Sequence, residues 1–154
     1  LFSFLTAKAE SVNFGGNEKM NGYKLSDYKD FEKKWKLVTT RYRKDTGELR
    51  FTYANLLAWK TLISGKTDYP DGAVFAKIGI ITEEDEMFPS SSIPSGAKRY
   101  QLMVRNKKKH KDDDGWGYAL FDQKGVTFNE DPKVKVASCV ACHKVAASRG
   151  FVFF

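Results

Sequence analysis

The alternation of apolar and polar residues predicts a β-hairpin in the first third of the chain. Residues 37–42 and 48–54 alternate with a period of two, which is typical of half-buried strands. The turn-forming residues Lys44-Asp45-Thr46-Gly47 lie between them. In the second strand, one face would carry Leu49, Phe51 and Tyr53, and the other face would carry Arg50 and Thr52.

Apolar residues at helical spacing predict two helices. The first covers residues 27–35, with Ser26 as its N-cap and with Tyr28, Phe31 and Trp35 on its apolar face. The second covers residues 55–63 and ends at Ser64-Gly65. Its apolar positions are Leu56, Leu57, Trp59, Leu62 and Ile63.

The most apolar stretch, residues 73–82, predicts a strand buried on both faces, with Lys77 in its middle. Residues 83–96 are acidic and then rich in Ser and Pro, which predicts a long surface connection. Two further strands are predicted at 100–105 and 117–122. The sequence therefore predicts an α+β, β-rich fold, in which a few helices pack on an antiparallel sheet.

Length and composition are those of one globular domain. The chain has 154 residues, of which 42% are hydrophobic and 29% are charged. We expect a single domain at 23–154, preceded by an N-terminal segment at 1–22. No apolar run approaches the ~18 residues of a membrane-spanning helix, so no membrane span is predicted.

The charge pattern argues against a nucleic-acid partner. The 26 Lys and Arg residues outnumber the 19 Asp and Glu residues, and the net charge is +7. The only dense basic run, Lys107 to Lys111, is followed at once by Asp112-Asp113-Asp114, whose carboxylates would repel phosphates. This segment predicts a solvated turn, and the positive surface would suit an acidic redox-partner protein.

The first residues, Leu1 to Ala9, resemble the end of a signal peptide that runs into an A-x-A cleavage site. This interpretation predicts an exported, periplasmic protein. The alternative is a mature N-terminus that is disordered or forms a strand.

The cysteines and histidines give the most specific signal. The chain has two of each, and three of these four residues fall in Cys139-Val140-Ala141-Cys142-His143. This C-x-x-C-H motif is the attachment signature of haem c. Two thiols one helical turn apart reach the two vinyl groups of a haem, and the adjacent imidazole binds the iron. Cys139 and Cys142 are therefore predicted to hold the cofactor, with His143 as the metal ligand.

Three other interpretations of the motif are weaker. A closed zinc site needs four ligands, and the remaining candidate, His110, lies in the lysine run. A thioredoxin-like redox pair expects a following helix in a βαβ unit, whereas only residues 144–154 remain. A disulfide leaves the adjacent histidine unexplained.

The sixth iron ligand would decide the function. The candidates for an electron-transfer cytochrome are Met20, Met87, Met103 and His110. Of these, only Met103 lies in a predicted strand, where methionine is more often part of the core. The pattern thus favours a five-coordinate iron that binds a small molecule.

Lys77 is unusual because burying an unpaired ammonium in an apolar strand is costly. It should snorkel to an edge, pair with a carboxylate or be chemically altered, and from the residues alone snorkelling is favoured. Phe75 and Gly79 flank it on the same face. A small Gly79 beside Phe75 would let a flat aromatic ligand lie against the strand.

Taken in order, these motifs resemble the cytochrome P460 family of mono-haem c-type proteins, over about two-thirds of the chain. The matching elements are Arg50-Phe51-Thr52-Tyr53, Trp59-Lys60, Asp71 to Lys77, Gly115-Trp116-Gly117-Tyr118 and Cys139 to Lys144. The resemblance implies a covalent bond between Lys77 and a meso carbon of the haem. It also implies a homodimer and an enzyme that oxidises hydroxylamine to nitrous oxide or nitric oxide at a five-coordinate haem.

One expected feature of the family is missing. Efficient oxidisers in the family carry a distal carboxylate on the strand that here covers residues 98–106, and this strand contains no acid. Arg50 matches a polar pocket position and could hydrogen-bond the ligand, although an arginine on a hairpin is more often a surface residue.

Two alternatives remain open. A β-sheet cytochrome of the c-prime type would bind or carry nitric oxide without a lysine link, behind an aromatic cap of Phe51, Phe75 and Phe121. A low-spin electron carrier would use Met103 as its ligand and would not react with small molecules.

Overall fold

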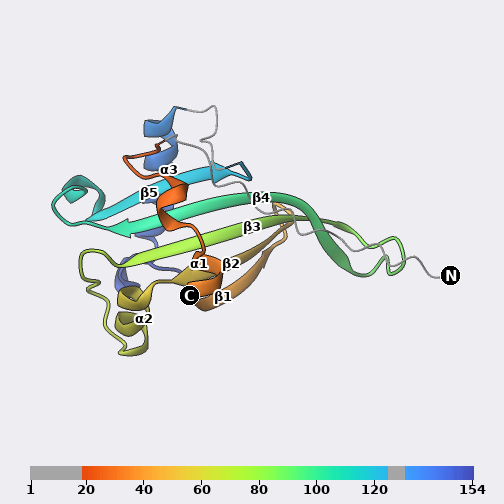
Figure 1. Ribbon diagram of the computed structural model, residues 1–154, viewed down its shortest axis with the longest axis horizontal. Helices are drawn as coiled ribbons and strands as arrows, with labels where there is room; N and C mark the ends of the chain where they lie inside the picture. The colour runs from red at the N-terminus through yellow and green to blue at the C-terminus, as the bar shows by residue number, and fades with distance from the viewer. Residues whose placement is uncertain (1–18, 125–130) are drawn as a thin grey trace.

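A five-stranded antiparallel sheet forms the centre of the molecule (Figure 1). The computed structural model describes residues 19–124 and 131–154. Within these ranges the strands follow chain order across the sheet, so that each strand pairs with the next one along the chain. The strands are β1 (Lys36–Arg43), β2 (Glu48–Ala54), β3 (Val74–Glu84), β4 (Ser92–Arg105) and β5 (Trp116–Asp122). The prediction of a β-rich α+β fold is confirmed.

Each face of the sheet packs against different helices. On one face, a 3-10 helix (Leu25–Tyr28) and α1 (Phe31–Lys34) pack on the apolar side chains of β3, β4 and β5. On the other face, a second core forms with α2 (Leu56–Ile63) and α3 (Pro132–Lys144). No helix in the described ranges is long and apolar enough to cross a membrane.

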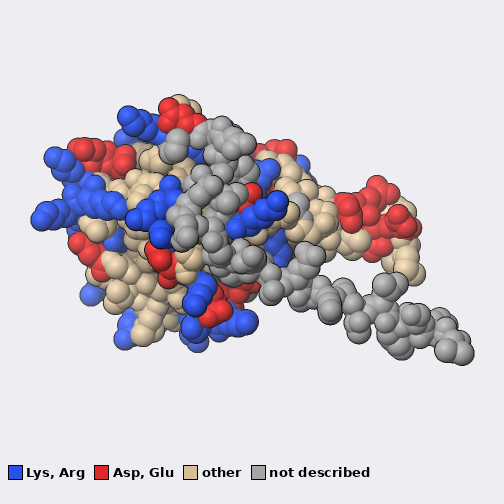
Figure 2. Space-filling view, turned by 45° about the horizontal axis from the view of Figure 1, so that its top comes forward, with Lys and Arg blue, Asp and Glu red and all other residues tan. Residues whose placement is uncertain are grey.

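The predicted surface connection at 83–96 is wrong, because β3 and β4 continue through it as a hairpin. Glu83 pairs with Ile93 and Glu84 with Ser92, and the turn lies between them. This hairpin forms an arm that extends well beyond the other strands (Figure 1). Its tip is acidic (Figure 2) and exposes Met87 and Phe88. Such an arm has solvent on both faces, so its sequence lacks the alternation that marks a half-buried strand.

The predicted helix at 27–35 is broken. Asp30 has a left-handed backbone (φ 65°) and separates the 3-10 helix from the single turn of α1. Ser26 lies inside the 3-10 helix and does not cap it. The aromatic face is still formed, because the Phe31 ring is buried and packs edge-on against Tyr53 and Tyr100.

The predicted helix at 55–63 is confirmed as α2. The side chain of Asn55 caps it by accepting a hydrogen bond from the backbone N–H of Ala58, and it also accepts one from Val74. Three of the expected apolar positions, however, point to solvent rather than to the core. These are Leu56, Leu57 and Ile63.

The segment at 107–114 was predicted to be a solvated turn, but its His110 side chain is buried. This side chain is 4% exposed, and its Nε2 atom lies 2.6 Å from the hydroxyl oxygen of Tyr23. The ammonium group of Lys109 covers the Tyr23 ring at 4.2 Å. His110 is thus part of the core and is not solvated with the lysines that flank it. The signal-like residues 1–9 lie outside the described ranges.

Candidate functional site

A pocket opens between the sheet and α3. Its floor is formed by two cross-strand rows on one face of the sheet. The first row contains Thr52, Lys77, Gln101 and Leu120, and the second contains Phe75, Met103 and Tyr118. Cys139 and His143 line the opposite wall. The empty space is about 610 Å³, part of which is open to solvent.

The attachment motif lies on α3. Asp131 caps this helix by accepting a hydrogen bond from the N–H of Lys133, and Pro132 opens its first turn. Cys139 and Cys142 are free thiols one turn apart, as the sequence predicts. Cys139 is half-buried at the pocket, while Cys142 is exposed.

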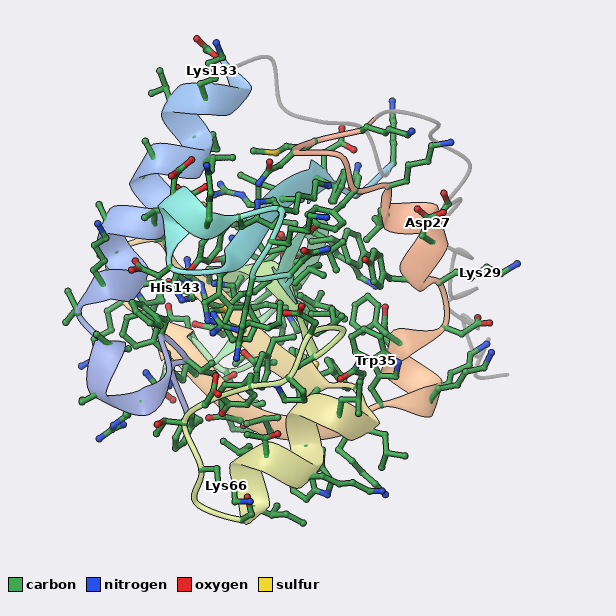
Figure 3. All side chains as sticks on the ribbon, turned by 90° about the vertical axis from the view of Figure 1, so that its left-hand side faces the viewer. Asp27, Lys29, Trp35, Lys66, Lys133 and His143 are labelled. Atoms are coloured by element: carbon green, nitrogen blue, oxygen red, sulfur yellow. The ribbon has the colours of Figure 1, made fainter. Side chains whose placement is uncertain are left out.

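The His143 side chain is held in one orientation. Figure 3 shows His143 on the side of α3 that faces the sheet, and Trp35 on the far side of the sheet. The Nδ1 atom of His143 donates a hydrogen bond to the carbonyl oxygen of Phe151, 2.7 Å away. The imidazole lies between the rings of Tyr118 and Phe153, with centroid distances of 4.9 and 5.1 Å. Burial lowers the pKa of His143, which favours a neutral ring with Nε2 free to bind a metal.

Lys77 lines the pocket from the middle strand of the sheet. It is opposite Thr52 on β2 and Gln101 on β4, so it has neighbours on both sides and does not reach a sheet edge. Burial, and then the positive charge of Arg50, lower the pKa of Lys77 to about 8. A large fraction of this amine is therefore neutral near pH 8, and a neutral amine is the nucleophilic form.

The space above Gly79 is not available to a ligand, contrary to the sequence interpretation. The Glu48 carboxylate fills it: a Cβ atom on Gly79 would lie 1.9 Å from Oε1 of Glu48. Phe75 does line the pocket, as expected. Glu48 was not among the predicted site residues, and its only signal in the sequence is that it shares one face of β2 with Arg50.

Arg50 lies beside the pocket and not in its wall. It pairs with Gly79 across the strands, one row away from Thr52 and Lys77. Its Nε donates a hydrogen bond to Oε2 of Glu48 at 2.5 Å. Arg50 is therefore a partly buried member of an ion pair, and the surface interpretation of this residue is wrong.

The structure separates the candidates for the sixth ligand. Met20 is buried on the other face, where its sulfur accepts a hydrogen bond from the N–H of Leu120. Met87 is exposed on the arm, and His110 is bonded to Tyr23. Of the four, only Met103 lines the pocket.

The aromatic cap proposed from the sequence does not form. Phe121 is fully buried in the core on the opposite face of the sheet, and Phe51 points to that same face. Phe75 alone of the three lines the pocket.

The residues present fit a covalently attached haem. Two thiols one turn apart, a neutral imidazole with one free nitrogen and a mostly apolar pocket beside them are the donor set and the surroundings that suit haem c. In the described part of the chain, no group of three or more His, Cys, Asp or Glu side chains is arranged to hold a metal ion. The fold and the site thus define a c-type haem protein.

Comparison with known proteins agrees with this class. The family model for Cytochrome P460 matches residues 27–154, and the chain belongs to this family. Membership implies a haem oxidoreductase with a covalently bound cofactor. A search of curated proteins gave no match.

Proposed function

We propose that the protein oxidises hydroxylamine to nitrous oxide or nitric oxide at a five-coordinate haem that is attached through Cys139 and Cys142 and cross-linked to Lys77. The observation that carries this proposal is that Lys77 on β3 and His143 on α3 line the same pocket. A lysine that shares a pocket with the histidine proposed to bind the iron supports a cross-link to a haem bound in that pocket.

Each side chain of the site has a separate proposed role. The two thiols would fix the porphyrin to α3, and Nε2 of His143 would bind the iron. Attachment of the Lys77 amine to a porphyrin carbon would remove an isolated buried ammonium from the pocket. When bound, the haem would supply the iron that takes electrons from the substrate nitrogen. Apolar residues such as Phe75 and Leu120 would restrict water.

The test is a steady-state assay of the purified holoprotein with hydroxylamine and a soluble electron acceptor. The proposal predicts acceptor reduction that depends on hydroxylamine and that is lost in Lys77→Met. Binding of nitric oxide without turnover would instead support the c-prime type of gas-binding cytochrome. A low-spin ferric spectrum that Met103→Ala converts to high-spin would support an electron carrier.

We also propose a periplasmic location, an acidic redox-partner protein and a homodimer. The acidic tip of the β3–β4 arm projects from a chain of net charge +7 (Figure 2), and this opposition of charge supports contact between two copies. Met87 and Phe88 would add apolar area to that contact. Light scattering of the wild type and of Met87→Ser/Phe88→Ser tests the dimer, which should dissociate more readily in the variant.

A further inference from the structure

Glu48 is the one fully buried carboxylate in the described part of the chain, with an exposed fraction of 0%. It lies at the start of β2, on the face that also carries Arg50 and Thr52. Its Oε2 accepts the hydrogen bond from Nε of Arg50, whereas its Oε1 has no hydrogen-bond partner among the described residues. A buried carboxylate with one free oxygen is costly to the fold, so its presence needs an explanation.

Gly79 makes room for this carboxylate. A Cβ atom at residue 79 would lie 1.9 Å from Oε1 and 2.5 Å from the carboxyl carbon of Glu48. The backbone of Gly79 is not in the left-handed region, so close approach is what requires glycine here. Gly79 is two residues from Lys77 on the same face of β3, a separation of ~6.6 Å along the strand. The carboxylate therefore lies beside the row that forms the pocket floor.

Arg50 binds this carboxylate one row away from the pocket floor. Its side chain is 19% exposed, and the bond to Glu48 uses Nε. The two Nη groups have no hydrogen-bond partner among the described residues and remain available as donors. The charges of Arg50 and Glu48 also act on Lys77. Burial is the largest cause that lowers the Lys77 pKa, the positive charge of Arg50 is the second, and the negative charge of Glu48 opposes them.

We propose that Glu48 is a positioning residue of the ligand side of this pocket: it anchors Arg50 so that the guanidinium donates hydrogen bonds to a small nitrogen–oxygen ligand beside Lys77, and it balances the positive charge there. This inference rests on the proposed function for the presence of the haem. Strand β4 presents Arg99, Gln101 and Met103 to this face and no carboxylate. In the described part of the chain, Glu48 on β2 is the buried carboxylate that lies beside this row.

The test measures how tightly the ferric holoprotein binds azide, followed by the absorption spectrum. In Glu48→Gln the amide still accepts the bond from Arg50, but the negative charge is gone, so azide should bind at least about threefold more tightly. Arg50→Gln should weaken azide binding by a similar factor. If Glu48 acts by anchoring Arg50, Glu48→Ala, which removes the acceptor of that bond, should weaken azide binding, and this effect should be much smaller in the Arg50→Gln background. Glu48→Asp should restore affinity close to that of the wild type.

Asp45→Asn is the matched control, because Asp45 pairs with Arg43 on the exposed turn of the same hairpin. It makes the same change of charge and should leave azide affinity unchanged. Gly79→Ala is a second variant that keeps the charge but displaces the carboxylate, and it should change azide affinity if Glu48→Gln does not fold. The proposal is overturned if Glu48→Gln and Gly79→Ala bind azide like the wild type, or if the Glu48→Ala and Arg50→Gln effects simply add.

This outcome is separate from that of the proposed function. A shift in azide affinity without hydroxylamine turnover would retain the Glu48 assignment and reject the enzyme. Hydroxylamine turnover by the wild type, together with unchanged azide affinity in the Glu48 variants, would retain the enzyme and reject the Glu48 assignment.

Discussion

The Nδ1 atom of His143 donates a hydrogen bond to the backbone carbonyl of Phe151, 2.7 Å away. A residue of the last turn of α3 is thereby tied to the final segment of the chain, which folds back along the pocket. Phe151 itself has a left-handed backbone (φ 70°), and its N–H bonds to the carbonyl of Ala146. The C-terminal residues therefore fix which ring nitrogen faces the pocket.

Removing one wall of the imidazole should loosen it. Phe153→Ala deletes the ring that packs 5.1 Å from His143, and we expect a loss of about 1 to 2 kcal/mol of stability because this side chain is only partly buried. The absorption spectrum should also show that the iron loses its histidine ligand at a higher pH than in the wild type. Phe154→Ala is the control, because Phe154 is exposed and contacts Arg149 instead. Equal acid transitions in both variants would contradict the role given to Phe153.

The two cysteines should hold the haem independently. In the Lys77→Met background, which removes the proposed cross-link, Cys139→Ser and Cys142→Ser should each keep a covalent haem through the remaining thiol, with a visible spectrum changed by the free vinyl group. Extraction with acidified organic solvent, followed by absorption of both phases, measures this. Haem that leaves the wild-type protein under these conditions would show that no thioether is formed.

His110 should make the fold less stable in mild acid. Burial, and then the charge of Lys109, lowers the pKa of His110, while Asp113 partly opposes this shift. The folded state thus binds fewer protons than the unfolded state between the lowered pKa and about 6.5, so the free energy of unfolding rises with pH through that window and stays at its lower value below it.

Urea titrations of the holoprotein at pH 5 and pH 7.5, followed by circular dichroism, measure this difference. In His110→Gln the amide can still bond to Tyr23, but it cannot take up a proton, so much of the pH dependence should disappear. A variant with the same pH dependence as the wild type would assign the effect to other groups.

The sequence predicts what local patterns encode. The hairpin of β1 and β2, the buried strand around Lys77 and the close approach of Cys139 and Cys142 all follow from periodicity or spacing within a few residues. The prediction of one continuous helix at 27–35 is wrong because a single residue, Asp30, adopts a left-handed backbone. The prediction of a surface connection at 83–96 is wrong because neither face of the arm is buried, so its strands have the composition of a loop.

Contacts between distant residues could not be predicted in the same way. The burial of His110 depends on Tyr23, and the bond from His143 depends on where the chain end returns. Gly79 was expected to let a flat ligand approach the strand, but the group that lies against it is the side chain of Glu48, which is on the neighbouring strand and pairs with Ile81, two residues beyond Gly79. Pairing register, which a single sequence does not specify, decides that contact.

The bond between Lys77 and the haem is the claim on which the account depends most. Peptide mass spectrometry of the digested holoprotein tests it directly. The account predicts one species in which the peptide with Cys139 and Cys142, one haem and the peptide with Lys77 are covalently joined. Haem on the cysteine peptide with a free Lys77 peptide would contradict it.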